Sequence, residues 1–226
     1  MSPVAFYRST IGKKIIMGIT GLIGVGFVII HMAGNLQVFI GQTKINDYGA
    51  MLHGPLAELT WLLRIVLIVS LILHVTMVVQ LTQRSAAARP IGYQKKTPQV
   101  STLASRTMKW GGVLLLVFIV VHILHFTTET IDPAGARGLT DIHGNRDVYS
   151  NIVMSFRIWW VALFYIVSML ALGLHLFHGA WASVRTLGYA KPSGNPLHRT
   201  IALSVAAIVW LGFTIIPVAV IAGIIR

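Results

Sequence analysis

The chain has no cysteine among its 226 residues. This absence excludes disulfide bonds, thiolate zinc sites and iron–sulfur clusters held by cysteine, so any metal chemistry must rest on histidine. Charge is scarce as well: charged residues make up 11% of the chain, whereas 55% of the residues are hydrophobic and the mean hydropathy is +0.77. A soluble domain of this size needs a much more highly charged surface. The composition therefore predicts a membrane protein.

Apolar runs long enough to cross a bilayer occur five times. A spanning helix needs about 20 mostly apolar residues, and the runs cover about residues 15–40, 62–83, 110–128, 158–184 and 200–225. Polar segments with turn-forming residues separate them, and we find no internal repeat, separate soluble domain or cleavable signal sequence. We therefore expect residues 1–226 to form one all-α membrane domain, a bundle of five transmembrane helices.

The charged residues predict how the bundle is oriented. Most lysines and arginines fall on one side of it: Arg8, Lys13, Lys14, Arg84, Arg89, Lys95, Lys96, Arg106, Lys109, Arg185, Lys191 and Arg199. The six acidic residues fall in or beside the other two connections: Asp47, Glu58, Glu129, Asp132, Asp141 and Asp147. The positive-inside rule then predicts a cytoplasmic N-terminus and an outer C-terminus in the cytoplasmic (inner) membrane. The same loops explain the net charge of +12, so nucleic-acid binding is not expected.

Histidine is costly inside a bilayer, and an intramembrane ionisable residue is a functional candidate. Each of the first four spans contains at least one: His31, His74, His122 with His125, and His175 with His178. A single membrane histidine can simply bond to a neighbouring helix. One on each of four neighbouring helices is harder to explain in that way.

Depth groups these histidines in two pairs. At about 1.5 Å per residue, His74 and His175 lie roughly 15 Å from the nearest basic residue of the cytoplasmic side, and His122 and His31 lie roughly 20 and 25 Å from it. Two pairs of imidazoles at two levels are what two bis-histidine haems require, and a haem with both axial positions filled transfers electrons rather than activating a ligand. Without cysteine the haems are held non-covalently, hence as haem b. We therefore expect two b haems between the first four helices.

Small residues on the same helix faces permit close approach of a porphyrin, although ordinary helix packing explains them equally. They are Gly24 and Gly34 near His31, Ser70 near His74, and Ser168, Ala171, Gly179 and Ala182 near His175.

Four segments, in order, carry a resemblance to a known family: "TGLIGVGFVIIHMAGNLQVFIG", "LILHV", "SRTMKWGGVLLLVFIVVH" and "GLHLFHGAWASVRTLG". With them the whole chain resembles the diheme cytochrome b membrane-anchor subunit of succinate dehydrogenases and fumarate reductases, in its five-helix single-polypeptide form. In the family, the ligand of the third span follows the paired glycines, here Gly111 and Gly112, at the position of His122 rather than His125. The ligand of the fourth span precedes a closing glycine, here Gly188, at the position of His175 rather than His178. The resemblance implies that His31 and His122 ligate the distal haem iron, and His74 and His175 the proximal one.

The resemblance also implies partners and a reaction. This chain would lie in the lipid membrane, and a flavoprotein subunit and an iron–sulfur subunit would dock on its cytoplasmic face. Their electrons from succinate would reach a quinone, expected to be menaquinone. The dicarboxylate chemistry of this tricarboxylic acid cycle enzyme would belong to the partner, because this chain has no flavin or dicarboxylate motif. The chain itself would be an electron-transfer and quinone-binding subunit.

Several polar residues keep more than one interpretation. Arg84, Arg106 and Arg185 enforce topology or pair with propionates of the proximal haem, and Arg106 is the preferred candidate for the second role. His125 and His178 bond a haem propionate, a quinone carbonyl or a facing helix, and we count both as candidate cofactor-binding residues. Glu58, Glu129 and His53 serve a proton path to the quinone or are plain interfacial residues. Trp61, Trp159 and Trp160 are expected to be interface anchors.

Other classes of protein stay open. The nearest is the cytochrome b anchor of another quinone-reactive complex, of hydrogenase or formate dehydrogenase type. The bc-type cytochrome is disfavoured because its ligands recur about fourteen residues apart on shared helices, a pattern that is missing here. A transporter with a histidine relay would often show inverted repeats, and a purely structural anchor would have no use for four buried imidazoles.

Overall fold

The computed structural model describes residues 2–88, 91, 101–189 and 196–226. In this part of the chain the fold is all-helical, and its only β pairing is an isolated bridge between Thr140 and Arg146. Within these residues, five helices are long and apolar enough to cross a membrane: Thr10–Phe39, Ala57–Ala87, Leu103–Thr127, Trp159–Thr186 and Leu197–Ile221. Each contains most of a predicted span, so the prediction of an all-α, multi-pass membrane protein is confirmed. With 25 to 31 residues, each helix exceeds the roughly 20 that a bilayer core requires.

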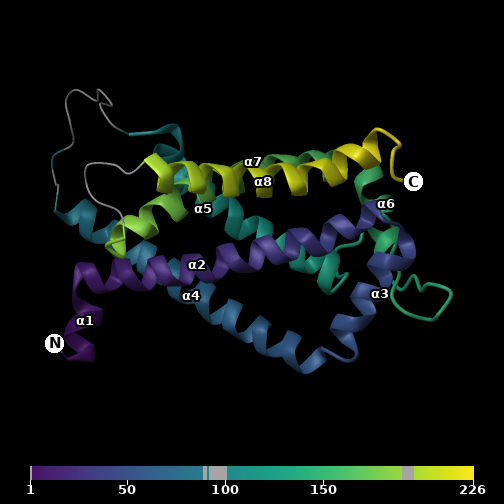
Figure 1. Ribbon diagram of the computed structural model, residues 1–226, viewed down its shortest axis with the longest axis horizontal. Coiled ribbons are helices and arrows are strands. Elements are labelled where there is room, and N and C mark those ends of the chain that lie inside the picture. Colours follow the sequence, from purple (N-terminus) through teal and green to yellow (C-terminus); the bar gives the residue numbers. More distant parts are fainter. Residues whose placement is uncertain (1, 89–90, 92–100, 190–195) are drawn as a thin grey trace.

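The described residues form helical elements of very different lengths. They are α1 (Pro3–Arg8), α2 (Thr10–Asn35), the 3-10 turn η1 (Leu36–Phe39), α3 (Gln42–His53), α4 (Ala57–Ala87), α5 (Leu103–His122), the π turn η2 (Ile123–Thr127), α6 (Val148–Arg157), α7 (Trp159–Thr186) and α8 (Pro196–Ile221). The five long helices run along the longest dimension, and the two termini lie at opposite ends, as an odd number of spans requires (Figure 1). We call these the α1 end and the α3–α6 end.

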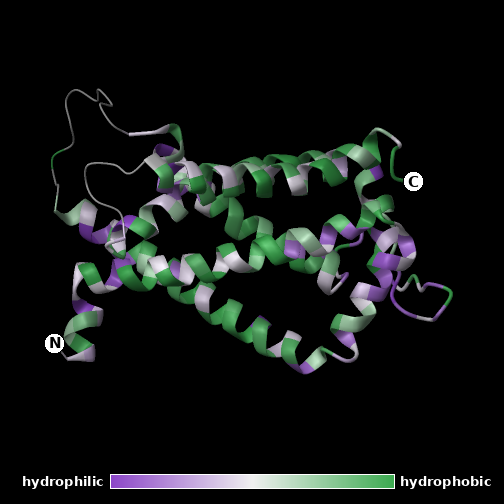
Figure 2. Ribbon diagram, viewed as in Figure 1, coloured by the Kyte–Doolittle hydropathy of each residue, from purple (hydrophilic) through white to green (hydrophobic). Residues whose placement is uncertain are grey.

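Hydropathy follows the same axis. Apolar residues dominate the middle of the long helices, and hydrophilic residues gather at the two ends (Figure 2). Many of the large apolar side chains on the long helices are exposed in the isolated chain, among them Ile65, Ile72 and Leu170. This arrangement suits a bundle whose outer surface contacts lipid.

Polar side chains begin several helices. Ser9 Oγ accepts a hydrogen bond from Gly12 N at 2.8 Å at the start of α2, and Thr102 Oγ1 accepts one from Ser105 N at 3.2 Å at the start of α5. Each bond satisfies one of the amide groups that the first turn of a helix leaves unpaired. The two caps therefore favour the residues at which α2 and α5 begin.

Two short helices at the opposite end were not expected from hydropathy. α3 and α6 lie beside each other there (Figure 1), and Asp147 joins them. Its carboxylate accepts hydrogen bonds from Gln42 Nε2 (2.8 Å), Asn46 Nδ2 (3.0 Å), Ser150 N (3.0 Å) and Ser150 Oγ (2.6 Å). Burial raises the pKa of Asp147, but these hydrogen bonds outweigh it and hold the pKa below its ordinary value.

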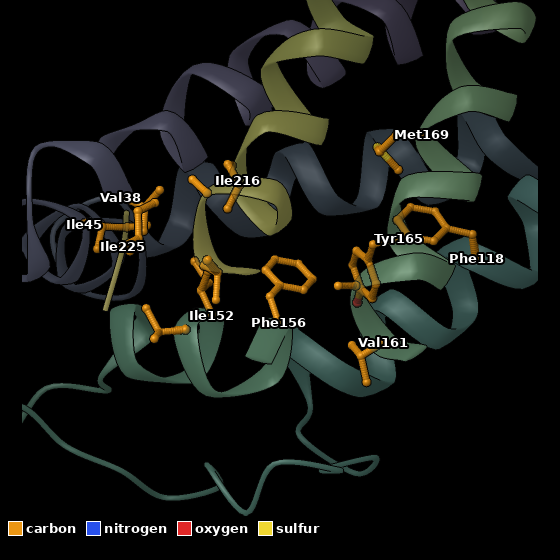
Figure 3. Close-up of a cluster of buried hydrophobic side chains, with 14 residues drawn as sticks. Val38, Ile45, Phe118, Ile152, Phe156, Val161, Tyr165, Met169, Ile216 and Ile225 are labelled. Atoms are coloured by element: carbon orange, nitrogen blue, oxygen red, sulfur yellow. The ribbon is translucent and has the colours of Figure 1, made fainter. Parts of the chain in front are cut away.

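The main hydrophobic core also lies at the α3–α6 end. Val38, Ile45, Ile152, Phe156 and Ile216 converge there from η1, α3, α6 and α8 (Figure 3). Tyr165 of α7 joins the cluster with its ring centre 5.1 Å from that of Phe156. The core therefore packs η1, α3 and α6 against α5, α7 and α8 at this end of the bundle.

Candidate functional site

The structure brings the four central histidines together as two facing pairs. The ring centres of His31 and His122 are 5.8 Å apart, and those of His74 and His175 are 6.2 Å apart. The first pair joins α2 to α5, and the second joins α4 to α7. These are the partners that sequence depth predicts, and each pair comes from two helices that are not consecutive in the chain.

The protein orients His74 from the neighbouring helix. His74 Nδ1 donates a hydrogen bond to the carbonyl oxygen of Met17 at 3.1 Å, and Thr20 Oγ1 lies 3.4 Å from the same nitrogen. A neutral imidazole that donates from Nδ1 keeps the lone pair on Nε2. Gly21 makes room for this ring, because a Cβ at that position would lie 3.3 Å from His74 Cε1.

His175 faces His74 from α7 with an unsatisfied nitrogen. Its Nδ1 is buried and has no hydrogen-bond partner in the described part of the chain. A small open cleft adjoins this histidine, with an empty volume of about 260 Å³ counting the part open to the outside, and Gly111, Ala171 and Leu174 also line it. Gly112 lies close by as well, since a Cβ there would be 3.9 Å from His175 Cε1. A buried imidazole nitrogen without a partner is costly, so a bound group at this nitrogen would be compatible with the environment of His175.

The pair formed by His31 and His122 opens on a larger cleft. Its empty volume is about 1190 Å³, counting the part open to the outside, and its walls are mostly apolar, with Phe118, Phe126 and Met169 among them. Asn35 Nδ2 donates to the carbonyl oxygen of His31 at 2.8 Å, and Tyr165 Oη lies 3.4 Å from His122 Nδ1. A concave, largely apolar site with a few convergent polar groups is typical of a cofactor or small-molecule site.

The donor set suits haem iron. Two imidazole nitrogens bound to one metal at about 2.0 Å from opposite sides would place the ring centres roughly 6 Å apart, close to the separations of both pairs. No group of three or more histidine or carboxylate side chains that could hold a metal occurs in the described residues. Two imidazoles alone would leave the other positions of a metal to a non-protein ligand, such as the four nitrogens of a porphyrin. The residues present therefore fit a haem at each level.

The small residues of α2 and α7 divide between the two interpretations. A Cβ at Gly34 would lie 2.7 Å from Tyr48 Cε1, so this glycine permits α3 to pack on α2. Gly24 and Gly179 have no atom within 4 Å of such a Cβ and leave open space beside the helices. Ser168 is fully buried, and its hydroxyl donates to the carbonyl oxygen of Phe164 at 2.7 Å. Helix packing explains Gly34 and Ser168, whereas Gly24 and Gly179 are free for a bound group.

His125 differs from its neighbour His122. It is buried, with Nδ1 3.0 Å from Tyr165 Oη and Nε2 3.0 Å from Ser155 Oγ. Both ring nitrogens are thus occupied by facing helices, the third of the roles considered from sequence. The π turn that begins directly after His122 changes the helical register at this point.

Arg146 and His53 line the cleft at the α3–α6 end and form its polar rim. Arg146 Nε donates to Glu129 Oε1 at 2.7 Å, and its guanidinium also donates to the carbonyl oxygen of Phe126 at 2.6 Å. His53 lines the cleft, donates from Nδ1 to the carbonyl oxygen of Gly49 at 2.9 Å and has Arg64 within 3.4 Å of Nε2. Glu58 is exposed at the start of α4. Arg146 was not singled out from sequence, because nothing in its local pattern shows that it reaches the cleft.

At the α1 end, the basic residues have several environments. Arg84 donates to the carbonyl oxygen of Arg8 at 2.9 Å and to Thr10 Oγ1 at 3.2 Å, which ties α4 to the start of α2. Lys13 is buried and donates to Gln80, and its ammonium lies 4.3 Å from the centre of the Tyr7 ring. These contacts give both residues a structural role.

The remaining basic residues of that end are more exposed. Arg185 Cζ lies 5.6 Å from the centre of the Trp181 ring. Arg106 is exposed in the first turn of α5, and His178 is half-buried one turn from His175. The roles of Arg106 and His178 toward a cofactor stay predictions. Arg89, Lys95, Lys96 and Lys191 lie outside the described residues. Trp61, Trp159 and Trp160 are exposed near the helix ends at the α3–α6 end, where interface anchors are expected.

Comparison of the chain with protein-family models, with curated proteins and with solved structures finds no match. The class is therefore defined by the fold and by its polar interior. This is an all-α, multi-pass membrane protein, and four of its long helices, α2, α4, α5 and α7, carry two facing pairs of histidines.

Proposed function

We propose that this chain is a diheme cytochrome b membrane anchor of a succinate:quinone oxidoreductase, which passes electrons from an iron–sulfur subunit to a quinone. The observation that carries the proposal is the geometry of the two histidine pairs, with ring centres 5.8 and 6.2 Å apart. A histidine relay for protons needs hydrogen bonds or bridging groups between successive histidines. It does not need the histidines to be arranged as two separate facing pairs, whereas two haems do. The family resemblance of the four motifs supports the same function.

Each pair would hold one iron. His31 and His122 would hold the distal haem and His74 and His175 the proximal one, each through an imidazole nitrogen of the neutral ring. A bis-histidine haem b supplies one-electron transfer without an open coordination site. The chain's own contribution is to orient the ligands, as the bond from His74 to the carbonyl of Met17 illustrates, and to exclude water with apolar walls.

The orientation and the partners belong to the same proposal. The α1 end carries Arg8, Lys14, Arg84, Arg106 and Arg185, so by the positive-inside rule it would face the cytoplasm. The flavoprotein and iron–sulfur subunits would dock there, on the side nearer to His74 and His175. The quinone, with menaquinone expected, would be reduced within the membrane at a site made by this chain.

Haem content tests the proposal directly. A pyridine haemochrome assay and a reduced-minus-oxidised spectrum of the purified full-length chain or complex should show two b haems per chain. His31→Ala and His122→Ala should each lose the same single haem, and His74→Ala and His175→Ala the other. His143→Ala, in the exposed loop between α5 and α6, is the matched control and should retain both. A wild-type chain without haem would refute the proposal.

Copurification separates the proposal from its nearest alternative. A flavoprotein subunit and an iron–sulfur subunit should accompany the chain from solubilised membranes, and succinate should reduce the haems of that complex. Reduction by hydrogen or formate instead would assign the chain to another quinone-reactive complex.

A further inference from the structure

An unbroken chain of hydrogen bonds connects the polar rim with one of the paired histidines. From the rim inward its members are Arg146, Glu129, Asn151, Ser155, His125, Tyr165 and His122. The successive donor–acceptor distances are 2.7, 2.9, 3.2, 3.0, 3.0 and 3.4 Å. The members come from α5, η2, α6, α7 and the loop after η2, so the chain exists only in the folded bundle.

The direction of the first bonds follows from the chemistry of Glu129. Its carboxylate is paired with the guanidinium of Arg146 and can only accept. Asn151 must therefore present its amide NH₂ to Glu129, which leaves its carbonyl oxygen facing Ser155. Because that oxygen can only accept, the single hydroxyl hydrogen of Ser155 is donated to it.

The same logic continues inward to the iron-ligand candidate. Ser155 has no hydrogen left, so the nitrogen of His125 that faces it, Nε2, must carry the proton. Neutral imidazole has one N–H, which makes His125 Nδ1 an acceptor for the hydroxyl of Tyr165. The oxygen of Tyr165 then accepts from His122 Nδ1–H, and the lone pair of His122 stays on Nε2.

Burial makes this direction hard to reverse. Relative exposure is 4% for Asn151, 0% for Ser155 and 4% for His125, so water cannot replace a bond that points the wrong way. Reversing one bond would set two lone pairs, or two hydrogens, against each other in a buried place. Glu129, near the outer end of this series of hydrogen bonds, has a left-handed backbone conformation with φ of 52°. This conformation is strained for a residue other than glycine.

We infer that Glu129, acting through Asn151, Ser155, His125 and Tyr165, fixes the tautomer of His122 so that Nε2 is available to the iron. Tyr165 is the positioning residue in contact with His122. This inference rests on the proposed function, since it concerns the ligation that the function requires. It explains why His122 is a ligand candidate while His125 is enclosed by protein. His125 passes the donor-to-acceptor direction of the hydrogen bonds on to Tyr165.

The redox potential of the distal haem tests the inference. An imidazole that donates from Nδ1 is a stronger ligand and favours ferric iron. In Tyr165→Phe, we expect the potential of one haem to rise, by about 59 mV for a tenfold change in its redox equilibrium, and its low-spin EPR signal to shift. The other haem should not change. Tyr149→Phe is the control, because its hydroxyl bonds instead to the carbonyl oxygen of Arg226.

A second pair of variants tests transmission along the chain. Ser155→Ala should shift the same haem in the same direction, whereas Ser168→Ala, which removes an equally buried hydroxyl bonded to its own helix, should not. Glu129→Gln retains an oxygen that accepts from Asn151 and should restore the wild-type potential that Glu129→Leu loses. Wild-type protein with two haems, and unchanged potentials in Tyr165→Phe and Ser155→Ala, would overturn the inference. Wild-type protein without haem would instead overturn the proposed function.

Discussion

Replacing Gly21 with leucine should remove the proximal haem alone. A Cβ at this position would already lie 3.3 Å from Cε1 and 3.5 Å from Nδ1 of His74. Alanine therefore displaces the ring by only a few tenths of an ångström, but each further carbon extends about 1.5 Å and occupies the place of the ring. His74 must then move by 1 Å or more, which breaks its 3.1 Å bond to the carbonyl of Met17.

The expected loss follows from the role of this bond. Removing the group that orients a metal ligand costs about 10- to 100-fold in affinity, and a displaced ring adds to that. The pyridine haemochrome assay should fall from two haems per chain to one, with the difference spectrum of the distal haem unchanged. Gly26→Leu is the matched control, since Gly26 is exposed on the same helix and has no atom within 4 Å of a Cβ. Two haems of wild-type affinity in Gly21→Leu would show that the reasoning is wrong.

Three predictions concern the α3–α6 end. Asp147→Ala should lower the free energy of unfolding by about 2–4 kcal/mol, because it removes a helix cap and leaves buried Asn46 without its acceptor. Thermal unfolding in detergent measures this loss. A loss no larger than that of Asp132→Ala would contradict the prediction. Since the pKa of Asp147 is lowered in the fold from 3.8, its stabilisation should be present in full above about pH 4 and be lost as the pH falls through the lowered pKa, an acid dependence that Asp147→Asn should remove. Gly34→Ala should cost about 1–3 kcal/mol through its clash with Tyr48, and Tyr48→Ala in the same chain should relieve the clash; equal stability of Gly34→Ala and wild type would exclude the contact.

Hydropathy located the membrane helices well but missed the short ones. α3 and α6 have 12 and 10 residues, too few for the apolar run that identifies a span. Only their packing shows why they form: Asn46 of α3 reaches Asp147 before α6, although about 100 positions separate the two in the chain. The ends of the spans also differ, since capped first turns extend α2 and α5 beyond their apolar segments.

The central histidines could be found from sequence because the bilayer makes polar residues conspicuous. A count of residues along each helix was enough to predict that His31 lies at the level of His122 and His74 at that of His175, since helical rise is constant. The residues that hold these rings could not be found in this way. Tyr165, Ser155 and Asn151 look ordinary in sequence, and nothing local shows which side chain each of them contacts.

The sequence by itself therefore determined the spans, the likeness in depth of the paired histidines and the absence of any thiolate chemistry. These depend on composition and on the fixed rise of a helix, which are properties of contiguous residues. Tertiary structure decided that Gly34 receives Tyr48, that Gly21 receives His74 and that His125 turns to Ser155 and Tyr165. Such contacts join residues 14 to 53 positions apart in the chain, so they depend on how the helices are rotated and packed against one another.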